Sequence, residues 1–168
     1  MGGIGMNISI RKAVKEDIKA IAEIYNDAIS NSTATFDLEE KTLEDRKQWF
    51  KEHDLNYPVI VAEYEGSVVG YGCLSSFRPK RAYDSTVEHS VYIHKDFRGK
   101  GIGTLILSEL IKLASDLKYH VMIAVITEGN EDSIRLHKKF NFEYAGCLKE
   151  VGYKFNQWQS ILFYQLLL

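Results

Sequence analysis

Residues 94–107, HKDFRGKGIGTLIL, place three glycines and three cations directly before an apolar run. Glycine permits left-handed dihedrals and close backbone approach. A helix that begins in such a turn directs free N–H groups and its positive dipole end at one point, which suits a phosphate. The stretch therefore predicts an anion site at the start of a helix over 102–117. Taken alone, it also fits a glycine-rich turn whose cations Lys95, Arg98 and Lys100 are spread over a solvated face.

Two common phosphate-binding motifs do not fit this turn. A P-loop needs Gly-Lys-Ser/Thr after four spacer residues that follow a first glycine, and the segment has no such run. The dinucleotide fingerprint G-x-G-x-x-G needs its third glycine at Thr104 or at Ile106, depending on the starting glycine. The strand before the turn is also the fourth predicted in the chain, with no βαβ unit before it. The sequence therefore argues against a doubly wound nucleotide-binding fold.

Hydrophobic periodicity predicts strands and helices on both sides of the turn. Strands are predicted over 7–13, in two runs that flank a hairpin turn at Glu65-Gly66, and over 85–94, 120–127, 142–151 and 158–167. Helices are predicted over 15–30, 42–53, 102–117 and 131–140. Thr42 and Asp45 have the spacing of a capping box at the start of the second helix. The order β-α-α-β-β-β-α-β-α-β-β predicts an α/β (α+β) fold with a mixed sheet.

Length and composition describe one globular domain. The chain has 168 residues, of which 45% are hydrophobic and 26% charged, and it has no repeat or Pro/Gly-rich linker. We expect a flexible leader over 1–6, which opens MGGIG, and a single domain over 7–168. The formal charge of -2 gives no overall basic field for nucleic acid or a membrane surface. No apolar stretch reaches the roughly 18 residues of a membrane span.

The cysteines and histidines predict neither a disulfide nor a metal site. Cys73 and Cys147 form no CxxC pair and no metal-ligand spacing, which is typical of the reducing cytoplasm. The five histidines are scattered, without an HExxH pattern. We therefore expect a cytoplasmic protein without a bound metal.

A second segment, NEDSIRLHKKFNF, begins a helix at an asparagine cap about thirty residues after the turn. With the R-x-x-G-x-G spacing of the turn, it resembles the GNAT superfamily of acyl-CoA-dependent N-acetyltransferases, whose two signature segments occur in this order and at this distance. The resemblance covers residues 7–168. It is closest to the phosphinothricin and methionine sulfone/sulfoximine N-acetyltransferase family, on AYDSTVEHSVYIH, AVITEGNEDSIRLHKKFNF and VGYKFNQW. Homodimers are common among these relatives, so the resemblance also implies a homodimer.

The resemblance implies the GNAT acyl-CoA N-acyltransferase fold, with about four helices around a central, mostly antiparallel sheet that splays between strands 86–93 and 120–127. The open strand edge would pair with the pantetheine arm of acetyl-CoA, and backbone N–H groups of the turn would bind its pyrophosphate. The implied cofactor-binding residues are Val91, Tyr92, Ile93, Arg98, Gly99, Lys100, Gly101, Ile102, Gly103, Thr104, Asn130 and Ser133. Asn141 replaces the family's glycine after the second signature helix. Asparagine tolerates the left-handed conformation there, so we expect the turn to persist.

Glu88 lies in the middle of an otherwise apolar strand. An ordinary carboxyl has a pKa of ~4 and an amine a pKa of ~10, so Glu88 is a weak base unless burial raises its pKa. Taken alone, it also fits an outward-facing strand carboxylate. The resemblance implies that it is the general base, acting directly or through water. His89 faces the other side of the strand by alternation, as a structural residue or at the rim of the substrate pocket.

His137 lies near the inner side of its helix, three residues after Ile134. A lone helical histidine is typical of core packing. The resemblance places His137 where many GNAT enzymes have a tyrosine that protonates the departing thiolate. An imidazole could donate that proton or bind an anionic group of the substrate, and the sequence leaves both roles open.

The segment SSFRPKRAYDST, residues 75–86, fits either a solvated basic loop or a recognition loop for a small acidic molecule. The resemblance favours the second, with Phe36 of TATF as an apolar wall of the same pocket. The implied substrate-binding residues are Phe36, Arg78, Lys80, Tyr83, Glu88, His89, Ser90 and His137. Trp49 and Trp158 fit core or interface aromatics.

The predicted function is acetyl transfer from acetyl-CoA to the α-amine of a small amino acid such as phosphinothricin, methionine sulfoximine or methionine sulfone. The amine would attack directly in a ternary complex. One alternative is a GNAT enzyme that acetylates a polyamine, an aminoglycoside or a protein N-terminus. The basic loop argues against polycations, which it would repel. Another alternative is a catalytically silent CoA-binding regulatory module, against which Glu88 and His137 speak.

Overall fold

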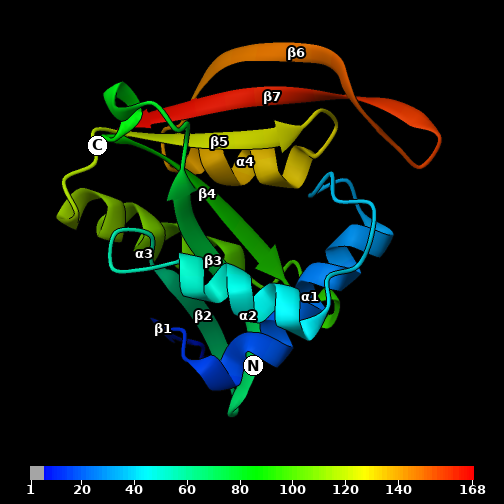
Figure 1. Cartoon of the computed structure of the whole chain (residues 1–168), viewed down its shortest axis with the longest axis vertical. Coiled ribbons are helices and arrows are strands. Elements are labelled where there is room, and N and C mark those ends of the chain that lie inside the picture. Colours follow the sequence, from blue (N-terminus) through cyan, green and yellow to red (C-terminus); the bar gives the residue numbers. More distant parts are fainter. Residues whose placement is uncertain (1–5) are drawn as a thin grey trace, which may run out of the picture.

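The computed structural model describes residues 6–168 as a seven-stranded mixed sheet with helices on both faces (Figure 1). The strand order is β1-β2-β3-β4-β5-β7-β6, and every neighbouring pair is antiparallel except β4 and β5. The strands are β1 (Ser9–Lys12), β2 (Val59–Tyr64), β3 (Ser67–Ser76), β4 (Thr86–Ile93), β5 (Val121–Thr127), β6 (Glu143–Lys154) and β7 (Gln157–Leu167). The α-helices are α1 (Ile18–Asn31), α2 (Leu43–Glu52), α3 (Ile102–Asp116) and α4 (Glu131–Lys139). The mixed, mostly antiparallel sheet is confirmed, and the predicted leader lies outside the described residues except for Met6.

The two faces of the sheet carry separate apolar cores, because alternate residues of a strand point to opposite sides. On one face, Ile21 and Ile24 of α1 pack with Val61 of β2 and Tyr71 of β3. On the other face, α3 and α4 cover a larger core. The buried residues that α3 contributes are Ile102, Ile106, Leu107, Leu110 and Ala114. The sheet is therefore the middle layer, with α1 and α2 on one side and α3 and α4 on the other (Figure 1).

Strands β4 and β5 begin side by side and then separate. They pair in parallel only from Thr86 to Glu88, opposite Val121 to Ile123, although both strands continue further. Each keeps its other neighbour, β3 for β4 and β7 for β5, so the sheet divides into two halves. Figure 1 shows the resulting wedge between the two strands. The predicted splay is confirmed, and the second half of β4 has an open edge where a ligand can pair.

The helix ends follow local sequence signals. Thr42 and Asp45 form the predicted capping box, in which Thr42 Oγ1 accepts from the Asp45 N–H at 3.1 Å and Asp45 accepts from the Thr42 N–H at 2.8 Å. Asn130 caps α4 by accepting from the Ser133 N–H at 3.2 Å. Asn141 has a φ of 63° after α4, which confirms that asparagine takes the left-handed position there.

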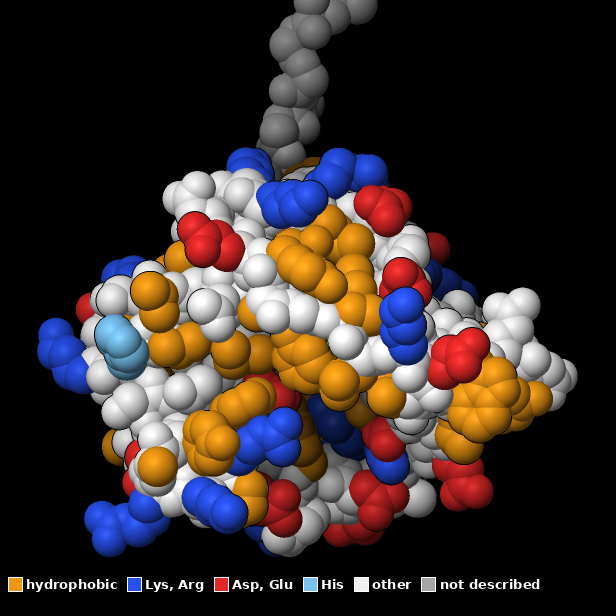
Figure 2. Space-filling view, turned by 90° about the horizontal axis from the view of Figure 1, so that it is seen from above, with side chains coloured by type: hydrophobic (Ala, Val, Ile, Leu, Met, Phe, Trp, Pro, Cys, Tyr) orange, Lys and Arg blue, Asp and Glu red, His pale blue; other side chains and the backbone are white. Residues whose placement is uncertain are grey.

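The C-terminal hairpin is longer than its sequence pattern predicts. Strand β6 runs to Lys154 instead of residue 151, and the turn is Phe155-Asn156. Register shifts after Tyr144 and Leu148 interrupt the alternation on which the prediction depends. Figure 2 looks onto this hairpin from above and shows apolar side chains spread over that face. The exposed apolar residues of the hairpin include Tyr144, Leu148, Val151, Tyr153, Phe155 and Trp158.

The helices and the cysteines give two further findings. Within residues 6–168, no helix is long and apolar enough to cross a membrane. Cys73 and Cys147 are both free thiols, and Cys73 is buried. Burial raises the pKa of the Cys73 thiol to about 11, so this cysteine is protonated and unreactive at neutral pH.

Candidate active site

A cavity of about 960 Å³ follows the wedge between β4 and β5 and reaches the glycine turn before α3. Its volume lies within the usual range for small-molecule sites. Most of the predicted cofactor-binding residues line it, together with three predicted substrate residues: His89, Ser90, Val91, Tyr92, Ile93, Arg98, Gly99, Gly101, Gly103, Asn130, Ser133 and His137. Three residues of the turn do not line it: Lys100, Ile102 and Thr104. The structure thus brings together two sequence segments that the resemblance assigns to one ligand.

The glycine turn leaves open space at the first turn of α3. Gly99 and Gly101 have φ values of 72° and 82°, and no atom lies within 4 Å of the place where a side-chain carbon would be. The N–H of Thr104 donates to the Gly101 carbonyl, so the N–H groups free for a ligand lie before it. The Ile102 side chain is buried in the core and anchors the helix start. Backbone N–H groups and the helix dipole are therefore aimed at the end of the cavity, where an anion would be stabilised.

The two cations of the turn have different surroundings. Arg98 lines the cavity, donates from Nε to the Ile93 carbonyl at 3.2 Å, and pairs with Asp27 at 2.9 Å. Lys100 instead donates to the Asp96 carbonyl at 2.8 Å, on the loop before the turn. Arg98 is therefore held at the cavity rim, whereas the Lys100 ammonium is directed toward its own loop.

Strand β4 separates two cavities and contributes to both. A second cavity, of about 440 Å³, lies under α2 on the other face of the sheet. Ser90 and Tyr92 line both cavities. The two cavities therefore share part of their wall on β4, two and four residues beyond Glu88, which itself lines neither cavity.

His89 and His137 form a hydrogen-bonded pair in the wall of the larger cavity, with their Nε2 atoms 2.8 Å apart. His137 Nδ1 lies 2.7 Å from the Ser133 carbonyl oxygen, which can only accept, so Nδ1 carries the proton. His137 Nε2 then accepts from the His89 Nε2–H. Burial lowers the pKa of both imidazoles, and for His89 the nearby His137 lowers it further. Both rings are neutral at pH 7, and His137 has no N–H free for a departing thiolate in this arrangement.

Glu88 points to the opposite face of β4 from His89, as predicted from alternation. Its side chain is half-buried, and its cross-strand neighbour Ser75 lines the second cavity. Burial raises the pKa of Glu88, and the positive charge of Arg78 opposes that shift. A carboxylate with a raised pKa is a stronger base, which is the property that a proton acceptor for an amine requires.

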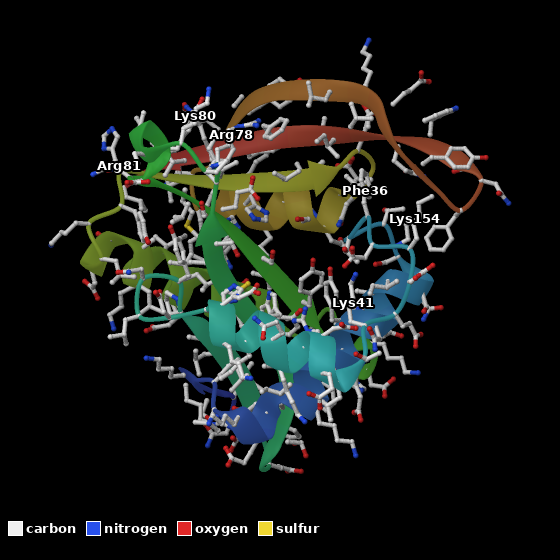
Figure 3. The ribbon with its side chains drawn as sticks, in the orientation of Figure 1. Phe36, Lys41, Arg78, Lys80, Arg81 and Lys154 are labelled. Carbon is white, nitrogen blue, oxygen red and sulfur yellow. The ribbon has the colours of Figure 1, made fainter. Side chains whose placement is uncertain are left out.

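The predicted recognition loop is exposed and lies at the start of β4. Arg78, Lys80 and Tyr83 are exposed, the Arg78 guanidinium lies over the Phe77 ring at 5.0 Å, and none of the three lines either cavity. Figure 3 shows Arg78 near the start of β4 and Phe36 beside Lys154 at the other end of the wedge. The Arg78 charge therefore acts on Glu88 by opposing the rise of its pKa, whereas Phe36 lies at the other end of the wedge.

Phe36 and Lys154 fasten the loop after α1 to the C-terminal hairpin. A side-chain carbon at Gly152 would lie 2.3 Å from the Phe36 ring, so the two segments meet at a position where only glycine fits. Lys154 is buried and donates to the Thr35 carbonyl at 2.8 Å. Residues 33–36 are thereby held over the open side of the wedge, since Thr127 also donates to the Thr33 carbonyl at 2.6 Å.

The sequence did not predict the second cavity. Its lining includes Tyr25, Arg46, Trp49, Tyr71 and Cys73, from α1, α2 and β3. One local signal was present, because Arg46 lies three residues before Trp49 and four before Phe50, on the apolar side of a helix. An arginine at a core-facing helix position indicates a buried charge that needs a partner.

The splayed strand, the glycine turn at a helix start and the cavity between them define the class of proteins that bind an extended anionic cofactor along an open strand. Residues 18–142 match the model of the Acetyltransferase (GNAT) family. The chain belongs to this family, as its two signature segments predicted.

The relatives include named acetyltransferases that span nearly the whole chain. An L-methionine sulfoximine/L-methionine sulfone acetyltransferase of Pseudomonas paraeruginosa is 42% identical over 163 residues, which are 96% of this chain and 95% of the relative. A solved ribosomal-protein-alanine N-acetyltransferase from Brucella melitensis is 44% identical, with a TM-score of 0.93 over 95% of this chain and 99% of its own. A phosphinothricin acetyltransferase from Sinorhizobium meliloti, solved in complex with AcCoA, is 38% identical, with a TM-score of 0.94 over 97% and 89%.

Proposed function

We propose that this protein transfers the acetyl group of acetyl-CoA to the α-amine of a small amino acid, such as methionine sulfone, methionine sulfoximine or phosphinothricin. One observation carries the proposal. The cavity that ends at the glycine turn and the cavity under α2 are both lined by Ser90 and Tyr92, which lie two and four residues beyond Glu88 on the same face of β4. An acyl donor in the first cavity and an amine in the second would therefore come together at β4.

The larger cavity fits acetyl-CoA in shape and in charge. The N–H groups between Gly99 and Gly103 would bind the pyrophosphate, with Arg98 at the rim. The open edge of β4 from His89 to Ile93 would pair with the amide groups of the pantetheine arm. The S. meliloti relative was solved with AcCoA, which supports the same ligand here.

Glu88 is the proposed general base. The amine nitrogen attacks the thioester carbon, a C–N bond forms, and the C–S bond breaks to release the CoA thiolate. Glu88 accepts the proton that the amine loses, directly or through one water. His137 is the proposed substrate ligand or proton donor to the thiolate. The donor role would require a tautomer other than the one that the Ser133 contact favours.

The basic loop before β4 is proposed to select the acceptor. Arg78 carries positive charge near Glu88, and Lys80 lies two residues further along the same loop. Both charges would attract the oxygens of a phosphinate, sulfone or sulfoximine group. Tyr83 packs edge-on against Phe77, with ring centroids 5.5 Å apart, which orders the loop. The same charges would repel a polyamine or an aminoglycoside.

We further propose a cytoplasmic homodimer that detoxifies such amino acids. The exposed apolar side chains of the β6–β7 hairpin support a dimer through this face, and the free thiols of Cys73 and Cys147 support a reducing compartment. Sedimentation should give a dimer for the protein and a monomer for Trp158→Glu. A monomeric wild-type protein would contradict the dimer.

The proposed role in detoxification has its own test. Cells that express the protein should tolerate methionine sulfoximine better than cells that do not.

Thiol release from acetyl-CoA tests the proposed activity directly. The panel contains the two methionine derivatives, phosphinothricin, unmodified methionine, spermidine and a peptide with an N-terminal alanine. We expect the fastest release with the sulfone, the sulfoximine or phosphinothricin. Turnover of spermidine or the peptide alone would overturn the substrate class, and no release with any amine would favour a silent CoA-binding module.

A further inference from the structure

The cavity under α2 has a buried cation at its wall. Arg46 is 5% exposed, and its guanidinium carbon lies 3.8 Å from the ring centroid of Trp49 and 4.5 Å from that of Tyr25. Both aromatic residues also line the cavity. Stacking on rings stabilises the faces of a guanidinium but leaves its N–H edge to find other partners.

That edge is poorly satisfied among the described residues. The one hydrogen bond recorded for the Arg46 side chain runs from Nη2 to the Tyr71 hydroxyl at 3.3 Å, and the buried Nε has no partner. Within residues 6–168, Arg46 takes part in no ion pair. A guanidinium has five N–H donors, so most of the hydrogen-bonding capacity of Arg46 is unused.

The acidic side chains around this cavity are already engaged or lie near its mouth. Asp37 accepts from the Tyr25 hydroxyl at 2.6 Å and pairs with Lys41 at 3.3 Å, and Asp45 caps α2. Glu39 and Glu40 also line the cavity but are exposed. The protein therefore surrounds a buried positive charge with carboxylates that do not pair with it.

Burial of an unpaired charge destabilises a protein, because the charge loses its hydration without gaining a partner. A ligand of opposite charge that binds there offsets this loss. The edge of a guanidinium matches the two oxygens of a carboxylate, which carries a full negative charge. A sulfone or an amide offers oxygens without that charge. The chemistry of Arg46 therefore favours a planar carboxylate over the other polar groups of the proposed substrates.

We propose that Arg46 binds the α-carboxylate of the amino acid whose α-amine is acetylated, an inference that rests on the proposed function. The cavity of Arg46 meets the larger cavity at Ser90 and Tyr92, which share a face of β4 with Glu88. The amine and the carboxylate of an amino acid are attached to one carbon. A carboxylate held in this cavity thus brings the amine toward Glu88 and leaves the side chain of the substrate to the basic loop of Arg78 and Lys80.

The competing role for Arg46 is structural, since stacking on Trp49 and Tyr25 also fastens α2 to α1 and the sheet. Thermal unfolding alone would not separate the two roles. A comparison of ligands does, because a purely structural arginine is indifferent to the carboxylate of a ligand.

Calorimetry in the presence of unacetylated CoA measures binding without turnover. The probes are L-methionine sulfone, its carboxamide and its decarboxylated amine. The proteins are wild type, Arg46→Gln, Arg46→Lys, and Lys47→Gln as a control, since Lys47 is an exposed cation on the same helix. Wild type and Lys47→Gln should bind the acid about tenfold or more tightly than either analogue. Arg46→Gln should lose that preference, and Arg46→Lys should keep part of it.

Two results would overturn the inference. One is a wild-type protein that binds the acid and the carboxamide equally, a comparison that needs no variant to fold. The other is an Arg46→Gln protein that keeps the preference of the wild type. The proposed function fails separately, when wild-type protein binds the acid but releases no thiol from acetyl-CoA in its presence.

Discussion

Glu88 and His89 are neighbours in the chain with opposite surroundings. Glu88 lies on the same face of β4 as Ser90 and Tyr92, and burial raises its pKa. His89 faces α4, where its ring bonds to His137. Two adjacent residues on a strand can therefore serve different parts of one site. The alternation of strand residues alone predicted this division.

Replacement of Glu88 by Gln keeps its size but removes its ability to accept a proton. General-base catalysis is typically worth ~10² to 10⁴ in rate, so kcat at pH 7 should fall by that order while the affinity for acetyl-CoA is unchanged. Raising the pH should partly restore the variant, because more of the amine is then already neutral. Initial rates from pH 7 to 9 give both results.

The same variant should not be less stable than wild type. Because the folded-state pKa of Glu88 is raised, its ionised form is disfavoured in the fold, and stability contributed by the protonated form is lost as pH rises through that pKa. Glutamine mimics the protonated form, so thermal unfolding at pH 7 should be unchanged or slightly higher. If Glu88→Gln turned over as fast as wild type, Glu88 would not be the general base and would be an ordinary carboxylate on a strand.

The limits of the sequence are clearest at Arg46 and at the histidine pair. The turn residues Gly99 and Gly101, and the cap Asn130, are parts of contiguous motifs, so their shared cavity could be predicted. The surroundings of Arg46 could not be predicted, because the aromatic rings around it come from three elements that only folding brings together. The contact of His89 with His137 joins residues 48 apart and could not be derived from local spacing.

At the scale of elements, the α3 turn should bind acetyl-CoA through its backbone. Gly101→Val would place a β-branched side chain at a φ of 82° and in the cavity. Gly66→Val is a matched control, since Gly66 has a φ of 77° and open space but lies in the β2–β3 turn. A ligand at a hundredfold excess over Kd adds roughly 2.7 kcal/mol to stability.

Thermal unfolding with and without acetyl-CoA separates the two glycine variants. Both should be less stable than wild type because of the backbone conformation. Wild type and Gly66→Val should gain the full shift with acetyl-CoA, and Gly101→Val should gain little. An undiminished shift in Gly101→Val would mean that the turn does not contact the ligand.

The contact between β4 and α4 should make the fold sensitive to acid. Burial lowers the folded-state pKa of His89 and His137, so the unfolded chain binds more protons below the ordinary histidine pKa of ~6.5. The stability that the two neutral rings contribute is therefore fully present above that pH and is lost as pH falls below it. For His89, whose pKa is lowered to about 3, the loss is roughly 1 kcal/mol per pH unit. Denaturant unfolding at pH 7, 6 and 5 measures the slope.

His89→Asn should reduce this dependence on pH, because it removes one of the two buried imidazoles. Equal slopes for wild type and His89→Asn would show that the pair does not titrate as its burial indicates.

The element pattern was predicted well because most helices and strands have strong local signals. The capping box at Thr42, the turn at Glu65-Gly66 and the apolar run of β5 all lie within the predicted ranges. The prediction of the β6–β7 hairpin was wrong in its bounds. Glu150 has a φ of 54° inside β6, and the register shifts break the two-residue alternation of strand side chains. Bulges of this kind are set by the partner strand rather than by the sequence of one strand.

At the scale of the whole molecule, the splay of the sheet is the feature that makes a site. Parallel pairing of β4 and β5 ends at Glu88, so the proposed base lies where the strands part, two residues before Ser90, which lines both cavities. An acyl donor and an acceptor can then enter from opposite faces of the sheet. This arrangement favours direct attack in a ternary complex over an acetylated protein intermediate, and the buried, protonated thiol of Cys73 offers no reactive nucleophile.

Initial rates with acetyl-CoA and L-methionine sulfone varied together test direct acetyl transfer in a ternary complex, with NMR of the product and the mass of the protein measured on the same samples. We expect intersecting double-reciprocal lines, an acetyl group on the α-nitrogen of the product, and a protein mass that acetyl-CoA alone does not change. Parallel lines with a protein that becomes one acetyl group heavier, or a product acetylated anywhere but the α-nitrogen, would contradict it.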